Sequence, residues 1–421
     1  MIPKSVLRTV IADQLRELES LDDSVPRTVF PAASSYSGAS AFVVKGVRRC
    51  GKSTLLKQLM KARFPDDYYY FNFDDERVAG FEDEDFQVLM ETLIESFGKR
   101  GSLFLDEVQN VEGWELFVNR VLRQGYRVFI TGSNANLLSR ELGTHLTGRH
   151  VDIELYPFSF AEFLTAGKIA VPEGVLYTTE QRALLSGRFR EYLVRGGMPE
   201  AVVLGNEAVL TGVLSDIIQR DIAERYRVRK PGELKAVIRF LIANAANPIT
   251  IQSIKDNFVL GSLNTVKKYL GYAEEAYLIF TVPRYGRKIK RLDRSPRKVY
   301  CVDNGIVVRN APGFAERRGA LLENVVAVQL RRLGREFYYY KGVNGAEADF
   351  VVLSEGLVIQ VCYELSYGNE GREVKGLVDA MGETGTVEGL ILTLEQEREL
   401  NHQGKMITVK PVWQWLLENE T

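Results

Sequence analysis

The segment Gly46–Ser53 carries the residue types that hold a polyphosphate. Its sequence, GVRRCGKS, fits the pattern G-x-x-x-x-G-K-[ST]. Gly46 and Gly51 permit a tight turn whose backbone N–H groups converge on phosphate oxygens, and a helix that begins here adds the positive end of its dipole. Lys52 supplies a point charge for the β- and γ-phosphates, and the hydroxyl of Ser53 can ligate Mg²⁺. The segment therefore predicts a site for ATP and Mg²⁺.

Three further residues complete the predicted nucleotide-binding segment. Arg49 and Cys50 fill loop positions whose backbone matters most, so we assign their side chains no role beyond proximity to phosphate. Thr54 follows the magnesium-binding serine at the start of the helix. An exposed thiol at Cys50 would make the site oxidisable, and the sequence does not determine its exposure.

Two adjacent acids follow a later apolar strand, in SLFLDEVQ. An acid at the carboxyl end of a neighbouring buried strand can hold Mg²⁺ through water, which assigns Asp106 to the metal. The adjacent Glu107 can then orient or activate the attacking water. The alternative is a pair of acids that only caps a strand end. The combination with a phosphate loop favours hydrolysis of the bound ATP.

Polar groups for the γ-phosphate follow the next predicted strand, YRVFITGS. Ser133 or Asn134 can hydrogen-bond the attacking water or the γ-phosphate. The helix after them ends in LTGRH, and Arg149 at that end can reach the γ-phosphate of a neighbouring subunit and offset charge in the transition state. The competing interpretation of Arg149 is a cation that stabilises the helix C-terminus. Weaker candidates for the same role are Arg140, Arg195 and Arg220.

The order of elements around these motifs indicates an α/β fold. Short apolar strands alternate with amphipathic helices, which calls for a parallel sheet covered on both faces. We expect strands at 41–44, 68–73, 102–107, 126–133 and 150–156, and helices at 54–64, 86–98, 114–125 and 135–148. The aromatic run 68–73 can be read as a base-stacking surface, but a buried strand accounts for it better.

Composition narrows the class of protein. The chain has 421 residues, is 45% hydrophobic and has a net charge of −1, so binding to nucleic acid or membrane must come from a local patch. Its three cysteines form no CxxC pair and its three histidines are scattered, which argues against disulfides, zinc sites and histidine-based metal centres. No apolar run is long enough to span a bilayer, and the N-terminus resembles an amphipathic helix rather than a signal peptide. We expect a cytoplasmic protein without membrane contact.

One local patch is basic. Residues 231–300 have the order helix, short helix, helix and basic hairpin, which is the order of a winged helix-turn-helix. The hairpin segment Arg284–Lys298 carries eight basic residues against one acid. It can contact DNA phosphates, or it can be a solvated hairpin or a surface that meets acidic groups of another domain.

Several long motifs together resemble the AAA-superfamily predicted ATPases of bacteria and archaea. In that family a C-terminal region of uncharacterised function follows the ATPase, and NGAEADFVV, IQVCYEL and REVKGLVDAM are similar to it. The resemblance implies an ATPase core with a helical lid, a winged-helix module and a domain similar to the PD-(D/E)xK nuclease fold. It also implies an arginine finger at Arg149. The motifs of the ATPase part are GVRRCGKSTLL, LFLDEVQNVEGWE, FITGSNANLLSRELGTHLTGRHVDIELYPFSFAEFL, RGGMPEAV and DIIQRDIAERYRV.

The nuclease-like pattern is incomplete in this sequence. Glu323 and Asp349 match its first two acids, but Gln360 takes the position of the third acid and Cys362 that of the lysine. A thiol cannot supply an ammonium charge, and glutamine binds a hard divalent cation less well than a carboxylate does. Lys341 could take the role of the missing lysine. We expect a degenerate domain that does not cut DNA.

These expectations give five parts: an N-terminal helix (1–30), an ATPase core (31–156), a helical lid (157–230), a winged helix (231–310) and a nuclease-like domain (311–421). The leading functional hypothesis is an ATP-driven switch or motor that forms a homo-oligomer and acts on DNA or a protein. One alternative is a signalling or defence regulator with slow turnover. Another is a nuclease gated by ATP.

Overall fold

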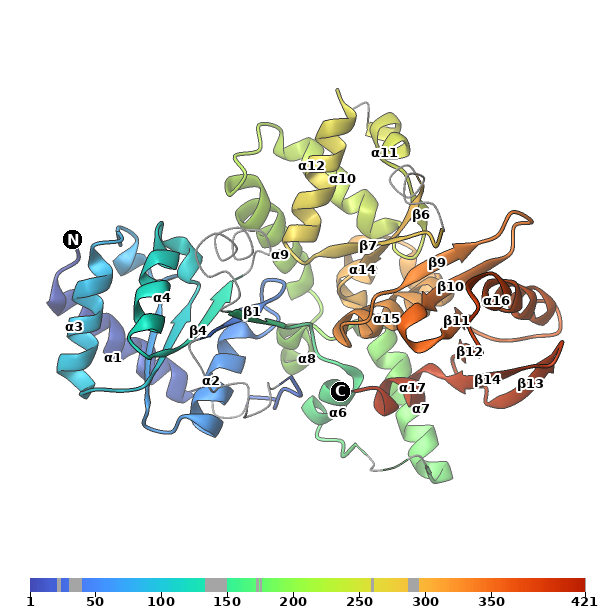
Figure 1. Cartoon of the computed structure of the whole chain (residues 1–421), viewed down its shortest axis with the longest axis horizontal. Coiled ribbons are helices and arrows are strands. Elements are labelled where there is room, and N and C mark those ends of the chain that lie inside the picture. The colour runs from blue at the N-terminus through green and yellow to red at the C-terminus, as the bar shows by residue number, and fades with distance from the viewer. Residues whose placement is uncertain are drawn as a thin grey trace. The chain divides into compact units, whose positions relative to one another are not determined.

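The computed structural model describes residues 1–20, 24–29, 40–132, 150–171, 174, 176–258, 261–286 and 295–420. The chain divides into two units, Met1–Leu155 and Tyr156–Thr421 (Figure 1). Within the described residues, no helix combines the length and the apolar character that crossing a membrane requires.

The first unit is built on a parallel five-stranded sheet. Its strands lie in the order β2-β3-β4-β1-β5, and every neighbouring pair is parallel. The expected alternation of strands and helices is therefore confirmed for this part. The strands are β1 (Ala41–Lys45), β2 (Tyr68–Asn72), β3 (Ser102–Asp106), β4 (Arg127–Gly132) and β5 (His150–Glu154).

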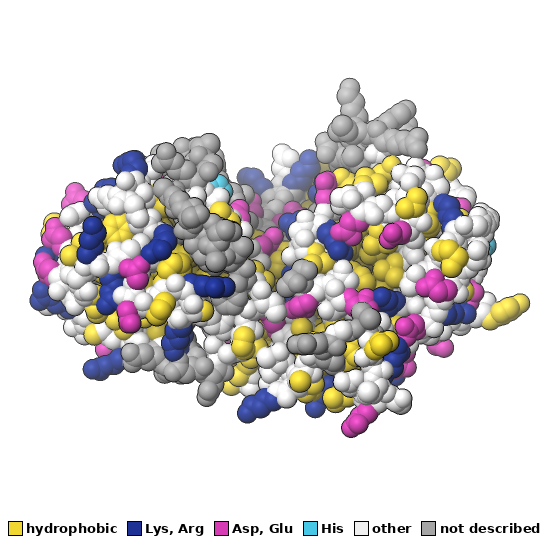
Figure 2. All heavy atoms as spheres, turned by 60° about the horizontal axis from the view of Figure 1, so that its bottom comes forward, with side chains coloured by type: hydrophobic (Ala, Val, Ile, Leu, Met, Phe, Trp, Pro, Cys, Tyr) yellow, Lys and Arg dark blue, Asp and Glu magenta, His cyan; other side chains and the backbone are white. Residues whose placement is uncertain are grey.

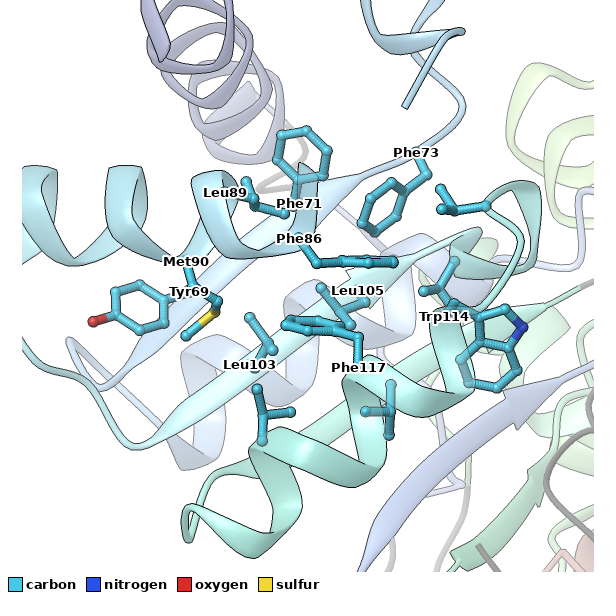
Figure 3. Packing of buried hydrophobic residues seen from close by; sticks show 14 of the residues in the cluster. Tyr69, Phe71, Phe73, Phe86, Leu89, Met90, Leu103, Leu105, Trp114 and Phe117 are labelled. Carbon is cyan, nitrogen blue, oxygen red and sulfur yellow. The ribbon is translucent and has the colours of Figure 1, made fainter. Parts of the chain in front are cut away.

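Helices cover both faces of this sheet. They are α1 (Lys4–Ser20), α2 (Lys52–Arg63), α3 (Asp85–Phe97) and α4 (Trp114–Arg123), with short 3₁₀ turns η2 (Glu76–Val78) and η3 (Val108–Asn110). One face packs against α1, α3 and α4, where Phe86 and Phe117 stack with ring centroids 4.2 Å apart (Figure 3). Tyr69 and Phe71 of β2 are 1% and 0% exposed in the same core. The aromatic run is thus part of the core, not a base-stacking surface.

On the opposite face of the sheet, aromatic side chains pack against the end of α2. Phe42, Phe104 and Phe129 stack across three neighbouring strands, with centroid distances of 4.9 and 4.4 Å. Phe64, directly after α2, packs on this row 5.2 Å from Phe129. Burial of each such ring contributes roughly 1.5–3 kcal/mol. This packing fixes the helix that begins at the predicted phosphate loop.

The second unit begins with helices. These are α6 (Phe160–Ala166), α7 (Thr179–Arg195), α8 (Pro199–Leu204) and α9 (Val209–Asp216), which continues into a π-helical stretch, η4 (Ile217–Glu224). A capping box at Thr178 and Gln181 starts α7, since each side chain accepts a backbone N–H of the other residue.

A small antiparallel sheet follows, with three helices before and between its strands. The elements are α10 (Pro231–Ala243), β6 (Pro248–Ile249), α11 (Ile251–Phe258), α12 (Leu263–Glu275), β7 (Ile279–Pro283) and β8 (Arg297–Cys301). The strand order is β6-β8-β7, so β8 is central.

The C-terminal sheet has six strands in the order β13-β14-β12-β11-β10-β9 and is mixed. Strand β13, which forms a hairpin with β14, was not expected from the sequence. The strands are β9 (Tyr338–Lys341), β10 (Glu347–Val352), β11 (Leu357–Val361), β12 (Glu388–Thr393), β13 (Arg398–His402) and β14 (Lys405–Pro411). The helices of this part are α14 (Asn304–Asn310), α15 (Arg318–Arg332), α16 (Glu370–Thr384) and α17 (Val412–Glu418), with turns η5 (Phe314–Glu316) and η6 (Leu353–Glu355).

Acidic and basic side chains are mixed over the face of the molecule shown in Figure 2. This mixing accords with the near-neutral net charge of −1. No large field of one sign appears among the described residues on that face, so electrostatic attraction of a partner would depend on a local segment.

The motif RGGMPEAV makes close backbone contacts within the second unit. The N–H of Gly197 donates to Asp303 Oδ2 (2.6 Å), and the Gly197 carbonyl accepts from the Phe158 N–H (2.7 Å). A Cβ atom on Gly197 would lie 2.2 Å from the Phe158 carbonyl oxygen. The glycine is therefore required by close approach of two backbones.

We predict that Gly197→Ala destabilises the second unit, because the added methyl group forces the backbone of Phe158 away. Overpacking of this kind costs about 1–3 kcal/mol, measurable by denaturant unfolding of the full chain. Gly212→Ala is the matched control, since nothing lies within 4 Å of a Cβ at that helical position. Equal stability of wild type and Gly197→Ala would contradict the prediction.

Candidate functional site

The predicted phosphate loop connects β1 to α2 and turns on its two glycines. Gly46 has φ +156° and Gly51 has φ +97°. A Cβ on Gly46 would lie 2.2 Å from the carbonyl oxygen of Leu155, so only glycine fits there. Gly51 is the N-cap of α2, and the N–H groups of the first helical turn are available to an anion.

Lys52 is held inside this turn. Its side chain is 6% exposed, and Nζ donates to the carbonyl oxygens of Gly46 and Val47 at 3.2 and 3.3 Å. The loop carbonyls thus hold the ammonium at the turn, where a phosphate would be a stronger acceptor for it.

Asp106 lies at the carboxyl end of β3, and hydrogen bonds connect it to the phosphate loop and to β4. It is 0% exposed. The hydroxyl of Ser53 donates to its carboxylate, as does the hydroxyl of Thr131 on β4, and Tyr70 on β2 donates to Oδ2 at 3.1 Å. Three hydroxyl groups from three different elements thus meet one buried carboxylate.

Burial raises the pKa of Asp106, and the charge of Glu107 raises it further. The hydrogen bonds from Ser53, Thr131 and Tyr70 act in the opposite direction. The site thus favours a cation beside this carboxylate, because a positive charge there would stabilise its ionised form.

Glu107 follows in a strained conformation, with φ 52° in the left-handed region. Its N–H donates to Thr131 Oγ1 at 2.9 Å, and its carboxylate accepts from the Gln109 amide. A non-glycine residue in this region costs free energy and persists where the surroundings determine it. This backbone conformation places the half-buried carboxylate of Glu107 close to Asp106.

Arg27 is a site residue that our sequence analysis missed. It is 4% exposed, its guanidinium donates to the Cys50 carbonyl oxygen at 2.8 Å, and its backbone N–H donates to Gln58 on α2 at 3.1 Å. The segment before the sheet thus fixes the phosphate loop from outside. No pattern in the sequence marks this arginine, because the contact spans residues that are distant along the chain.

The structure describes only some of the other residues that the sequence predicted for this site. Ser133, Asn134 and Arg149 lie outside the described residues. Cys50 is buried, and burial raises the pKa of its thiol, so the loop is not an exposed thiolate site. Arg195 pairs with Glu191 and Glu207 in the second unit.

The C-terminal candidates lie together in the second unit. Glu323 on α15, Asp349 on β10 and Gln360 on β11 line one polar cavity of about 800 Å³. The ammonium of Lys298 bonds both carboxylates at 2.8 Å and was also missed by sequence analysis. Lys341, the expected substitute, pairs with Glu347 at a half-exposed position instead.

Lys298 stays charged at neutral pH. Burial alone would lower its pKa, but the charges of Asp349 and Glu323 outweigh burial and raise it. It is the last residue of the basic segment Arg284–Lys298, and it is only 7% exposed. This residue bonds acidic groups of α15 and β10 and is not available to a DNA phosphate.

Comparisons with known proteins agree with the geometry of the first unit. Residues 39–164 match the model of an AAA domain, and residues 186–315 and 318–415 match two domains of unknown function, DUF8612 and DUF4143. The uncharacterized protein MJ1544 of Methanocaldococcus jannaschii is 33% identical over 395 residues, which cover 89% of this chain and 88% of the relative. The chain belongs to the same family. Residues 39–164, most of which lie in the first unit, match an AAA domain, which is a nucleotide-binding domain of ATPase type.

A second relative is an uncharacterized protein of Haemophilus influenzae. It is 34% identical over 344 residues, which cover 77% of this chain and 82% of the relative. Solved structures with partial similarity include AMPPCP-bound DnaA from Aquifex aeolicus, at 16% identity and a TM-score of 0.22, covering 63% of this chain and 88% of that one. A katanin structure has 13% identity and a TM-score of 0.25, covering 64% and 86%. Scores this low do not establish a shared overall fold.

We predict that Arg27→Ala weakens nucleotide binding, because the phosphate loop loses its charged hydrogen bond at Cys50. Such a bond contributes about 1.5–3 kcal/mol. If half of this free energy is lost from nucleotide binding, the affinity should fall by about three- to tenfold. Titration with a fluorescent ATP analogue measures the change. Arg123→Ala, at the exposed end of α4, is the control. An unchanged dissociation constant in Arg27→Ala would show that the loop is held without this contact.

Proposed function

We propose that this protein is a Mg²⁺-dependent ATPase whose reaction takes place at the phosphate loop. The observation that carries the proposal is the hydrogen-bonded group at the carboxyl ends of β1, β3 and β4. It joins Ser53 of the loop to Asp106 and Thr131. A hydroxyl beside a buried carboxylate is a donor set that suits a hard divalent cation. When bound, Mg²⁺ supplies charge neutralisation for the phosphates.

The backbone of the loop, Lys52 and Ser53 have separate roles in this proposal. The backbone N–H groups of Gly46–Thr54 bind the α- and β-phosphate oxygens, together with the positive end of α2. Lys52 moves from its own loop carbonyls to the β- and γ-phosphates, since these are stronger acceptors. Ser53 and Asp106 hold the magnesium ion.

Glu107 acts as the general base that orients and deprotonates the attacking water. Its carboxylate stands beside the buried Asp106 and is half-buried, as a base in contact with one water needs to be. Thr131 fixes both acids at once, because its hydroxyl donates to Asp106 and accepts the Glu107 N–H. Thr131 is therefore a positioning residue.

Two further roles are proposals that rest on sequence. Ser133 or Asn134 contacts the attacking water or the γ-phosphate. Arg149, provided by a neighbouring copy, stabilises charge in the transition state. The role given to Arg149 requires a homo-oligomer.

The second unit would pass the nucleotide state to a partner, DNA or a protein. We propose a helical lid at 157–230, a winged helix at 231–310 and a degenerate nuclease-like domain at 311–421. The order α10, α11, α12, β7 and β8 supports the winged helix. In this proposal the part of the basic segment before Arg297 contacts phosphates.

We predict that Glu107→Gln binds ATP but turns it over at least about 100-fold more slowly, because removal of a general base costs about 10²–10⁴ in rate. Lys52→Ala should lose nucleotide binding. Phosphate release and equilibrium binding distinguish the two variants. Glu112→Gln, an exposed carboxylate farther along the chain, is the control. Wild-type turnover in Glu107→Gln would refute the role given to Glu107.

We predict that duplex DNA stimulates ATP turnover and that this stimulation falls steeply between about 50 and 200 mM salt, because phosphate contacts release counterions. Lys288→Glu combined with Lys290→Glu should lower DNA affinity at least several-fold and leave basal turnover unchanged. Lys168→Glu with Lys405→Glu is a control outside the basic segment. Turnover that is the same with and without DNA would favour a protein partner.

A further inference from the structure

Lys298 is an unusual residue for the centre of a sheet. It lies on β8, the central strand of its sheet, and pairs with Pro248 on one side and Val282 on the other. Successive residues of a strand point to opposite faces, so Lys298 and Tyr300 share one face. Both side chains contact Glu323 on α15. The rigid strand therefore fixes where the ammonium lies.

Glu323 and Asp349, which line the polar cavity, both accept hydrogen bonds from Lys298 and from neighbouring donors. Glu323 Oε1 accepts from Lys298 Nζ at 2.8 Å and from the Tyr300 hydroxyl at 2.7 Å. Asp349 Oδ1 accepts from Lys298 Nζ at 2.8 Å, and Oδ2 accepts from the Val361 N–H at 2.9 Å. These donors fix the orientation of both carboxylates.

Gln360, which stands beside these two acids, is hydrogen-bonded within the cavity. Gln360 Oε1 accepts the Asp349 N–H at 3.2 Å, and its Nε2 donates to Glu373 at 2.7 Å. The exposed Arg372 pairs with the same glutamate. Cys362 contributes no thiolate, because burial raises its pKa to about 12.

A divalent cation does not fit this donor set. Hard cations take about six oxygen ligands from carboxylates, carbonyls and water, whereas here a buried ammonium already bridges the two acids. Among the described residues no group of three or more His, Cys, Asp and Glu side chains is placed to hold a metal ion. The nuclease-like pattern implies a metal, and the structure has a lysine in its place.

We infer that the Lys298 ammonium takes the place of a divalent cation between Glu323 and Asp349. The group Lys298, Glu323 and Asp349 is thus a metal-free ion-pair cluster, called here the charge lock, that joins β8 to α15 and β10. The ammonium supplies one positive charge from within the chain, and this charge offsets one of the two carboxylate charges. This inference does not depend on ATP hydrolysis in the first unit.

The charge lock also anchors one end of the basic segment to the C-terminal sheet. The other end is anchored as well, since the Tyr285 N–H donates to the Tyr339 carbonyl oxygen at 2.7 Å and the Arg284 guanidinium donates to the Lys341 carbonyl oxygen. Both flanks of 287–294 are thus held on the same sheet.

The test uses the nucleotide-free full chain and Mn²⁺ as the probe, with bound Mn²⁺ measured by the loss of the free-ion EPR signal. Wild type and Asp349→Asn should bind Mn²⁺ equally. Lys298→Ala should gain one Mn²⁺ site, which Lys298→Ala combined with Asp349→Asn should lose. Lys341→Ala is the matched control, because it removes a lysine from a half-exposed ion pair.

Thermal unfolding provides a second measurement. Lys298→Ala should lower Tm by roughly 5–15 °C, because it leaves two buried carboxylates without their cation. Mn²⁺ should restore much of this loss and leave the Tm of wild type unchanged. Wild-type Mn²⁺ binding that Asp349→Asn abolishes would overturn the inference, and so would a folded Lys298→Ala that gains no site. If Lys298→Ala does not fold, the comparison of wild type with Asp349→Asn still decides.

Discussion

The parallel alignment of β1, β3 and β4 is the constraint on which the candidate ATP site depends. Their carboxyl ends meet at one edge, since Val44 on β1 is in register with Thr131 on β4, and Leu105 on β3 with Ile130. The phosphate loop, Asp106 and Thr131 are therefore neighbours, although they are far apart along the chain. The stacked phenylalanines behind this edge hold α2 at the position where its N-terminus faces the loop.

The two units contain two different solutions to the same electrostatic problem. In each of them, buried carboxylates require compensation, because ionised groups are unstable away from water unless they are paired. Asp106 is bonded by hydroxyl groups, which orient the carboxylate and leave its charge to be balanced. Glu323 and Asp349 are bonded by one ammonium, which offsets one of their two charges from within the chain. A site of the first kind can respond to a ligand that brings a cation, whereas a site of the second kind already contains a cation from the chain itself.

Close backbone contacts explain why particular glycines stand in the sequence motifs of this chain. Gly46 approaches Leu155 in the first unit, and Gly197 approaches Phe158 in the second. A similar contact occurs at Gly376, where a Cβ would lie 2.1 Å from the Glu347 carbonyl oxygen. These glycines let α16 and two loops come closer to neighbouring backbone than any other residue would permit. Their role is structural in the second unit, and at Gly46 it shapes the phosphate loop.

Local patterns in the sequence determined the parallel sheet, the phosphate loop and the pair Asp106–Glu107, because strand length, helix periodicity and the glycine–lysine spacing are properties of neighbouring residues. Only the tertiary structure decided the partners of these residues. Arg27 and Tyr70 reach the site from distant segments, and neither belongs to a motif. Lys298 appears in the sequence as one basic residue among eight. Its function as an internal cation follows from the packing of β8 against α15 and β10, since a charge acts through distance in space and not through position along the chain.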